Sequence, residues 1–228
     1  MLYAGLRYGA KIKAYYVNTS FQPEFELNDA KKLAKHLGTE MTIIEKDILE
    51  NKKVVSNPHD RCYYCKTAIF NTLRDQAIAD GFTVILDGTN ASDDAFDRPG
   101  MKALRELSVR SPLQECGITK NEVRRLSKEA GLFTWDKPAY ACLATRIPSG
   151  FKITEELLQR IENSEDVLFS FGFSDFRVRV VEAAGDCFAK IQLPKEQLNN
   201  LMDKRHDVVK EIKQFFPSVL LDLEGRNE

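Results

Sequence analysis

The sequence predicts an α/β protein in which a parallel sheet has helices on both faces, followed by a smaller α+β domain. Short apolar runs alternate with segments of helical period before residue 100, and this alternation is typical of a parallel sheet. After Gly150 the order changes to a helix, two strands, a helix and a last strand. The 228 residues are 43% hydrophobic and 29% charged, which supports a sizeable core and excludes a disordered or fibrous chain.

The first part of the chain supplies the elements of the predicted parallel sheet. Apolar residues at helical spacing, with a glycine after the last of them, indicate where the helices end. The expected elements are a strand over 12–17, a helix around 30–37, a strand over 41–44, a helix from about 60 to 79 and a strand over 84–86. The last strand leads into the turn Asp87-Gly88-Thr89-Asn90. Ligands of parallel sheets bind at the carboxyl ends of the strands, so we expect this turn to take part in binding.

The region from residue 98 to 150 is irregular and contains one helix with a clear start. Thr119 is its expected N-cap, Glu122 completes a capping box and Gly131 ends the helix. Beyond it we expect a helix over 154–171, strands over 176–181 and 187–193, a helix from about 195 to 216 and a strand over 219–223. The change of pattern predicts two domains, residues 1–150 and 151–228.

The charge of the chain limits the classes of partner. Its 33 Lys and Arg nearly balance its 34 Asp and Glu, which gives a net charge of −1. Such a chain lacks the bulk positive charge of nucleic-acid-binding or membrane-surface proteins. No apolar run approaches the roughly 18 residues of a transmembrane helix, and the first residues do not have the pattern of a signal peptide. We therefore expect a cytoplasmic protein.

Five cysteines in a chain without a secretion signal suggest reduced thiols, with metal binding or catalysis as alternatives. Cys62 and Cys65 form a Cys-x-x-Cys pair at the start of a predicted helix, which places both sulfurs on one face. The helix N-terminus favours their thiolates, and two buried cysteines are the weaker alternative. With Cys142 as a third ligand, the pair could bind zinc if His59 is a fourth, or three irons of a four-iron cluster. Cys187 shares a strand face with apolar residues and is expected in the core.

Two groups of charged residues are candidates for binding. Arg177 and Arg179 project from the same face of a predicted strand, a fork that suits phosphate or carboxylate. A solvated polar face is an equal alternative for this pair. Asp93 and Asp94 follow the turn at residues 87–90 and could hold a divalent cation, or they could belong to an ordinary polar loop.

Seven segments, in order along nearly the whole chain, resemble the LarE family of ATP-dependent sulfur transferases, which have a Rossmann-like fold of the PP-loop (adenine nucleotide α-hydrolase-like) superfamily. These segments are NPHDRCYYCK (57–66), DGTNASD (87–93), RPG (98–100), SPLQE (111–115), TWDKP (134–138), ACLATRIP (141–148) and RVR (177–179).

The resemblance implies a reaction with two steps. ATP·Mg adenylates a carboxylate of a pyridinium dicarboxylate mononucleotide, and sulfur then displaces AMP to give a thiocarboxylate, a step toward a nickel-pincer cofactor. One branch of the family sacrifices a cysteine, whereas the branch with three cysteines carries a [4Fe–4S] cluster that delivers sulfide. The resemblance further implies a homo-oligomer with a small-molecule nucleotide substrate and without nucleic-acid or membrane partners.

The resemblance also gives the expected roles of the site residues. Those expected to bind nucleotide or substrate are Asp87, Gly88, Thr89, Asn90, Asp93, Arg98 and Arg146. Cys142, Arg177 and Arg179 are expected to be catalytic, and Cys62, Cys65 and Cys142 to hold the cluster. Asp93 and Asp94 are the expected magnesium ligands.

The sequence departs from the family at its start. The family opens with a strand and a Ser-Gly-Gly-x-Asp-Ser loop that cradles the ATP phosphates, and these 228 residues contain no such loop. We therefore expect an N-terminally incomplete PP-loop domain that releases little pyrophosphate from ATP on its own. The alternatives are another PP-loop adenylating enzyme, for tRNA thiolation or amide formation, and a non-catalytic iron–sulfur or nucleotide-binding protein. The balanced charge argues against a tRNA substrate.

Overall fold

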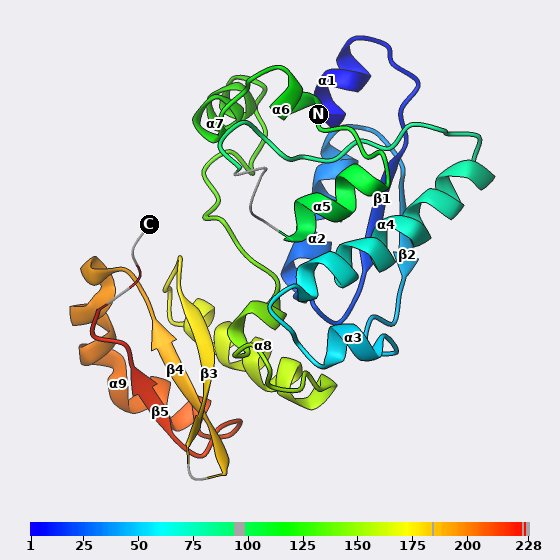
Figure 1. The fold of residues 1–228 in the computed structure, drawn as a ribbon. Helices are drawn as coiled ribbons and strands as arrows, with labels where there is room; N and C mark the ends of the chain where they lie inside the picture. The colour runs from blue at the N-terminus through cyan, green and yellow to red at the C-terminus, as the bar shows by residue number, and fades with distance from the viewer. Residues whose placement is uncertain (94–98, 184, 225, 227–228) are drawn as a thin grey trace. The chain divides into compact units, whose positions relative to one another are not determined.

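The structure is a computed structural model that describes residues 1–93, 99–183, 185–224 and 226. The chain divides into two compact units (Figure 1). Unit 1 comprises residues 1–54 and 58–137, and unit 2 comprises residues 55–57 and 138–228. A parallel sheet and helices in unit 1, and a mixed sheet and helices in unit 2, confirm the predicted α/β class. The predicted boundary at residue 150 stays a prediction.

The helices and strands follow one another in this order: α1 (Leu2–Arg7), β1 (Ala14–Asn18), α2 (Glu24–His36), β2 (Met41–Glu45), α3 (Lys52–Val55), α4 (Arg61–Ala79), α5 (Pro99–Glu106), α6 (Pro112–Glu115), α7 (Lys120–Glu129), the 3-10 helix η1 (Leu143–Arg146), α8 (Glu155–Ser170), β3 (Arg177–Ala183), β4 (Asp186–Gln192), the 3-10 helix η2 (Lys195–Gln197), α9 (Leu198–Ile212) and β5 (Val219–Leu221).

Strands β1 and β2 of unit 1 pair in parallel, from Ala14 opposite Met41 to Asn18 opposite Glu45. Successive residues of β1 reach different helices. The Tyr15 hydroxyl donates to Asp80 at the C-terminal end of α4, whereas Tyr16 lies close enough to Glu26 of α2 for the two to interact electrostatically. Burial, followed by these acidic neighbours, raises the pKa of each tyrosine to about 12. Helices α4 and α2 therefore lie on opposite faces of β1.

The third strand expected over 84–86 does not form in the described structure. Its backbone makes one isolated parallel bridge, between Leu86 and Arg110. Val84 is 59% exposed and Leu86 41% exposed, although both are apolar. All five residues of β1 are likewise half-exposed, although a parallel sheet with helices on both faces predicts buried strands. A strand is stabilised by its neighbours on both edges, and here one edge of each segment lacks a described neighbour.

Short-range sequence signals, a glycine stop and a capping box, predicted two helices of unit 1 correctly. Helix α4 starts after Asp60 and ends at Asp80, and Gly81 follows with a φ of 81°, as the predicted stop requires. Helix α7 has the predicted capping box, in which the Thr119 side chain accepts from the Glu122 backbone and the Glu122 carboxylate accepts from the Thr119 backbone. Cys62 lies in the first turn of α4 and Cys65 at the start of the second.

Unit 2 is built on a sheet of order β3-β4-β5, with β3 and β4 antiparallel and β4 and β5 parallel. One face of this sheet is buried, through Val178 and Val180 of β3 and Ala189 and Ile191 of β4. Helix α8 packs against both β3 and α9 and buries all four apolar residues expected on its inner face: Leu157, Leu158, Ile161 and Leu168. Alternation then places Arg177 and Arg179 on the opposite, half-exposed face, as predicted.

One ion pair lies inside the core of unit 2. The Arg146 and Glu165 side chains are 0% and 2% exposed, and the Arg146 Nε and Nη2 atoms donate to the Glu165 carboxylate at 2.8 and 3.2 Å. The same carboxylate accepts from the Tyr140 hydroxyl at 2.5 Å and from the Val178 backbone N–H at 2.9 Å. One carboxylate thereby joins η1, α8 and β3.

Removal of one member of this pair is expected to destabilise unit 2. Glu165→Ala leaves a buried guanidinium without its counter-charge, and we expect a loss of about 3–5 kcal/mol in the free energy of unfolding. The double variant Arg146→Met/Glu165→Leu has no buried charge and should recover most of that loss. Urea unfolding of the single variants Arg146→Met and Glu165→Leu and of the double variant measures the coupling. Additive losses in the double variant would show that the pair does not act as a unit.

No helix in the described part of the chain is long and apolar enough to cross a membrane.

Candidate functional site

Two half-buried guanidinium groups stand beside the buried ion pair of unit 2. Arg179 donates through Nε to the Gln192 side chain at 2.5 Å and through Nη1 to the Thr145 carbonyl at 3.0 Å. Gln192 in turn donates to Asp222 at 2.6 Å. No described residue forms a hydrogen bond or an ion pair with the Arg177 guanidinium within the usual distances. Arg177 is therefore able to bind an anion that the unit does not itself supply.

The charges of these arginines affect one another. Burial lowers the pKa of Arg177, and the nearby Arg146 lowers it further. Burial also lowers the pKa of Arg179, followed by the charges of Arg177 and Arg146. Burial alone would lower the pKa of Arg146 too, but the hydrogen bonds and charge of Glu165 outweigh it and raise that pKa. A bound anion would relieve the mutual repulsion of three cations that share one carboxylate in the core.

Cys142 lies next to this group of cations. It caps η1 at its N-terminus, and its carbonyl accepts from the Thr145 backbone at 2.9 Å and from Arg146 Nη1 at 3.4 Å. The half-exposed thiol is also one of the groups whose charge raises the pKa of Arg146. Cations beside a cysteine favour its thiolate, which is the form that acts as a nucleophile or a metal ligand.

The sequence analysis did not select Glu165, Tyr140 or Thr145, which hold the arginines in place. The position of Glu165 in α8 is the sequence signal that could have identified it as a buried, paired residue. It lies four residues after Ile161 and three before Leu168, both buried, so it is on the apolar face. A carboxylate on such a face needs a partner, and Arg146 is that partner.

The turn at residues 87–90 of unit 1 is organised by its own carboxylates. Asp87 accepts from the Thr89 hydroxyl and the Ser111 hydroxyl, each at 2.6 Å, and from the Thr89 backbone N–H at 3.2 Å. A Cβ placed on Gly88 would meet no atom within 4 Å, so open space borders the turn there. The hydrogen bonds of Asp87 hold the backbone of the turn in place at the end of segment 82–86. A ligand of a parallel sheet is expected at this end.

The expected magnesium ligands are described only in part. The Asp93 carboxylate accepts from the Asn90 backbone at 3.0 Å and from the Asn90 side chain at 2.9 Å. Asp94 and Arg98 lie outside the described residues. Within the parts that are described, no group of three or more His, Cys, Asp or Glu side chains is placed to hold a metal ion. Carboxylate oxygens still suit Mg²⁺ chemically, so the donor set fits the ion.

The three cysteines of the expected cluster are divided between the units. Cys62 is exposed, Cys65 is half-exposed, and both lie in the first five residues of α4 in unit 1, with Arg61 Nη2 at 3.8 Å from the Cys62 sulfur. Cys142 belongs to unit 2. Three thiolates suit a four-iron cluster with one open iron, so the donor chemistry fits the predicted group. Cys187 is half-buried, and burial raises its pKa.

Comparison with known proteins identifies relatives that match nearly the whole chain. No protein-family model matches it. An uncharacterised protein of Synechocystis sp. is 39% identical over 212 residues, which cover 92% of this chain and 77% of the relative. An uncharacterised protein of Methanocaldococcus jannaschii is 29% identical over 210 residues, or 92% of this chain and 79% of the relative.

A third relative has a named activity. The pyridinium-3,5-bisthiocarboxylic acid mononucleotide synthase of Lactiplantibacillus plantarum is 31% identical over 215 residues, which cover 94% of this chain and 76% of that protein. This match confirms the resemblance drawn from the seven segments, and the chain belongs to the LarE family of sulfur transferases.

Proposed function

We propose that this protein converts a carboxylate of a pyridinium dicarboxylate mononucleotide to a thiocarboxylate at the expense of ATP. In the first step the carboxylate attacks the α-phosphate of ATP and releases pyrophosphate. In the second step a sulfur nucleophile attacks the acyl carbon and AMP leaves. Support comes from the membership in the LarE family and from the name of the relative from Lactiplantibacillus plantarum.

The observation that carries the proposal is the half-buried Arg177 without a partner in the described structure, in a group with Arg179 and Arg146 beside Cys142. A nucleotide phosphate is the anion that such a fork of guanidinium groups binds well. In this proposal Arg177 and Arg179 bind the phosphate of the substrate. Arg146 is a positioning residue, because its donors are already used by Glu165 and by carbonyls of η1.

Unit 1 is the proposed binding site of ATP. The turn Asp87-Gly88-Thr89-Asn90 would contact the nucleotide with its backbone, and Asp93 and Asp94 are the proposed ligands of its magnesium ion. We further propose that Cys62, Cys65 and Cys142 hold a [4Fe–4S] cluster, whose chemistry is to supply sulfide for the second step. A family member that used Cys142 itself as the sulfur source would leave dehydroalanine at this position.

The proposed reaction is tested with two anaerobically reconstituted proteins, the 228-residue chain and the same chain preceded by the strand and Ser-Gly-Gly-x-Asp-Ser loop of the family, each with ATP·Mg and pyridinium-3,5-dicarboxylic acid mononucleotide. With the longer protein we expect a product in which sulfur replaces a carboxylate oxygen, detected by mass spectrometry, with one pyrophosphate released for each sulfur transferred. The 228-residue chain alone should release little pyrophosphate. Bulk tRNA serves as the competing acceptor in a parallel reaction. Sulfur in the tRNA with an unchanged pyridinium compound would contradict the proposal.

Replacement of Arg177 should weaken substrate binding without loss of stability. Arg177→Gln removes a charge that no described side chain pairs with, so the fold loses no ion pair. We expect KM for the mononucleotide to rise about 10- to 100-fold, the loss typical of a hydrogen bond to a charged group. Arg125→Gln is the control, because it removes an exposed arginine that pairs with Glu129 on α7. An equal effect of the two substitutions on KM would count against the assignment.

Iron content tests the proposed cluster. Anaerobic reconstitution should give a coloured protein with about four irons per chain. Cys62→Ala, Cys65→Ala and Cys142→Ala should each lose most of the visible absorption, because each removes a ligand. Cys116→Ala removes an exposed cysteine outside the proposed ligand set and should keep the full iron content. A colourless wild-type protein with bound zinc would rule out the cluster.

A further inference from the structure

Helix α4 begins with a buried cation beside an exposed cysteine. Arg61 is the first residue of the helix and is only 7% exposed, whereas Cys62 next to it is exposed. The Arg61 Nη2 atom donates to the Cys62 sulfur at 3.8 Å. Side chains of neighbouring residues on a helix point in different directions and do not normally meet. The long Arg61 side chain therefore turns back to reach the sulfur.

This position is electrostatically unfavourable for an arginine. The N-terminus of a helix carries a partial positive charge, which favours acidic side chains and disfavours cations. In the described structure the first turn of α4 has no acidic residue, and Asp60 before it makes no capping hydrogen bond with its side chain. Arginine is also seldom this buried unless it is paired. Residues that break such local rules are expected at functional sites.

Lys66 adds a second positive charge near the two cysteines of α4. It follows Cys62 by one helical turn, so the two side chains share a face of the helix. The Lys66 side chain crosses Gly100 at the start of α5, where a Cβ would lie 3.0 Å from Lys66 Cδ. This half-buried lysine forms no ion pair or hydrogen bond with a described residue. Its charge is thus available to an anion.

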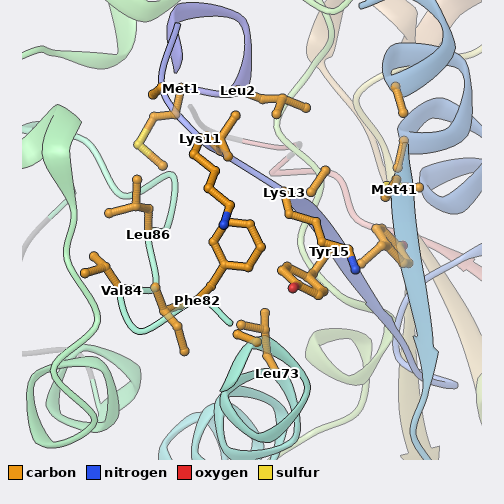
Figure 2. A pocket seen from close by; sticks show the side chains of 18 of the residues that line it. Met1, Leu2, Lys11, Lys13, Tyr15, Met41, Leu73, Phe82, Val84 and Leu86 are labelled. Atoms are coloured by element: carbon orange, nitrogen blue, oxygen red, sulfur yellow. The ribbon is translucent and has the colours of Figure 1, made fainter. Parts of the chain in front are cut away.

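Two lysines that line the cavity of about 580 Å³ beside β1 are held differently (Figure 2). Lys13 pairs with Asp80 at 2.6 Å, and Lys11 Nζ lies 5.4 Å from the centre of the Phe82 ring. Unit 1 therefore supplies partners for these two lysines but, in its described part, none for Lys66.

A four-iron cluster with three thiolate ligands is an anion, and bound sulfide adds to its negative charge. Two cations and a helix N-terminus around Cys62 suit such a group. We propose that Arg61 is a positioning residue for the cluster, which donates to the Cys62 sulfur when that sulfur binds iron and thereby raises the reduction potential of the cluster. A hydrogen bond withdraws negative charge from the ligand sulfur and so stabilises the reduced state. This inference rests on the proposed cluster.

Electron paramagnetic resonance tests the hydrogen bond in the reconstituted 228-residue protein. The arginine side chains are labelled with a heavy nitrogen isotope, and the cluster is made paramagnetic by reduction with europium(II). We expect a magnetic coupling between the reduced cluster and an arginine nitrogen in the wild type. The coupling should disappear in Arg61→Lys, which has no guanidinium at this position.

Redox titration of matched variants separates the hydrogen bond from the charge. Arg61→Lys keeps the charge and Arg61→Gln removes it, and both should have a lower midpoint potential than the wild type. Arg74→Gln is the control and should keep the wild-type potential, because Arg74 is exposed and lies about three turns after Cys62 on the same helix.

A separate comparison covers the case in which the Arg61 variants lose their iron. The nitrogen coupling of the wild type must then survive in Arg177→Gln and in Arg179→Gln, which remove the arginines near Cys142. Loss of the coupling in either of these two variants would assign it to that arginine and overturn the role of Arg61.

Two further results would overturn the inference. A wild-type protein with about four irons but without an arginine coupling would show that no guanidinium donates to the cluster. Equal potentials of Arg61→Lys and the wild type would show that only the charge acts. A wild-type protein without iron would instead refute the proposed cluster itself, so the two failures are distinguishable.

Discussion

The buried ion pair of Arg146 and Glu165 is the interaction on which the proposed site depends. Removal of two charges from water is costly, and Glu165 offsets the cost only because it accepts four hydrogen bonds. Glu165 lies on α8, and its partners come from η1, β3 and the segment before η1. The carboxylate therefore fixes the loop that carries Cys142 against the strand that carries Arg177.

The same pair explains why the site can accept an anion. The hydrogen bonds that Glu165 accepts come from Arg146, Tyr140 and Val178, so its charge offsets those of Arg177 and Arg179 only in part and forms no described ion pair with either. The charge of Asp222 raises the pKa of Arg179, but the Asp222 carboxylate accepts from Gln192 and pairs with Lys190 at 2.9 Å. Unit 2 thus keeps excess positive charge on the half-exposed face of its sheet. Such an excess raises the free energy of the empty site, and a bound phosphate lowers it.

The sequence predicted those elements whose signals are local. The capping box at Thr119, the glycine after α4 and the apolar spacing of α8 each lie within a few residues of the element they define. The strand expected at 84–86 failed for a non-local reason, since an apolar run becomes a strand only beside a partner edge. The anchoring of Arg146 by Glu165 was not foreseen either, because 19 residues separate them and only packing brings them together.

The proposed function depends most on the binding of a phosphate group by Arg177 and Arg179. Calorimetric titration of the protein with a pyridinium mononucleotide, and with the same compound after removal of its phosphate, tests this claim directly. We expect binding of the mononucleotide that weakens as salt is added, and at least tenfold weaker binding of the dephosphorylated compound. Equal affinities for the two compounds would contradict the claim.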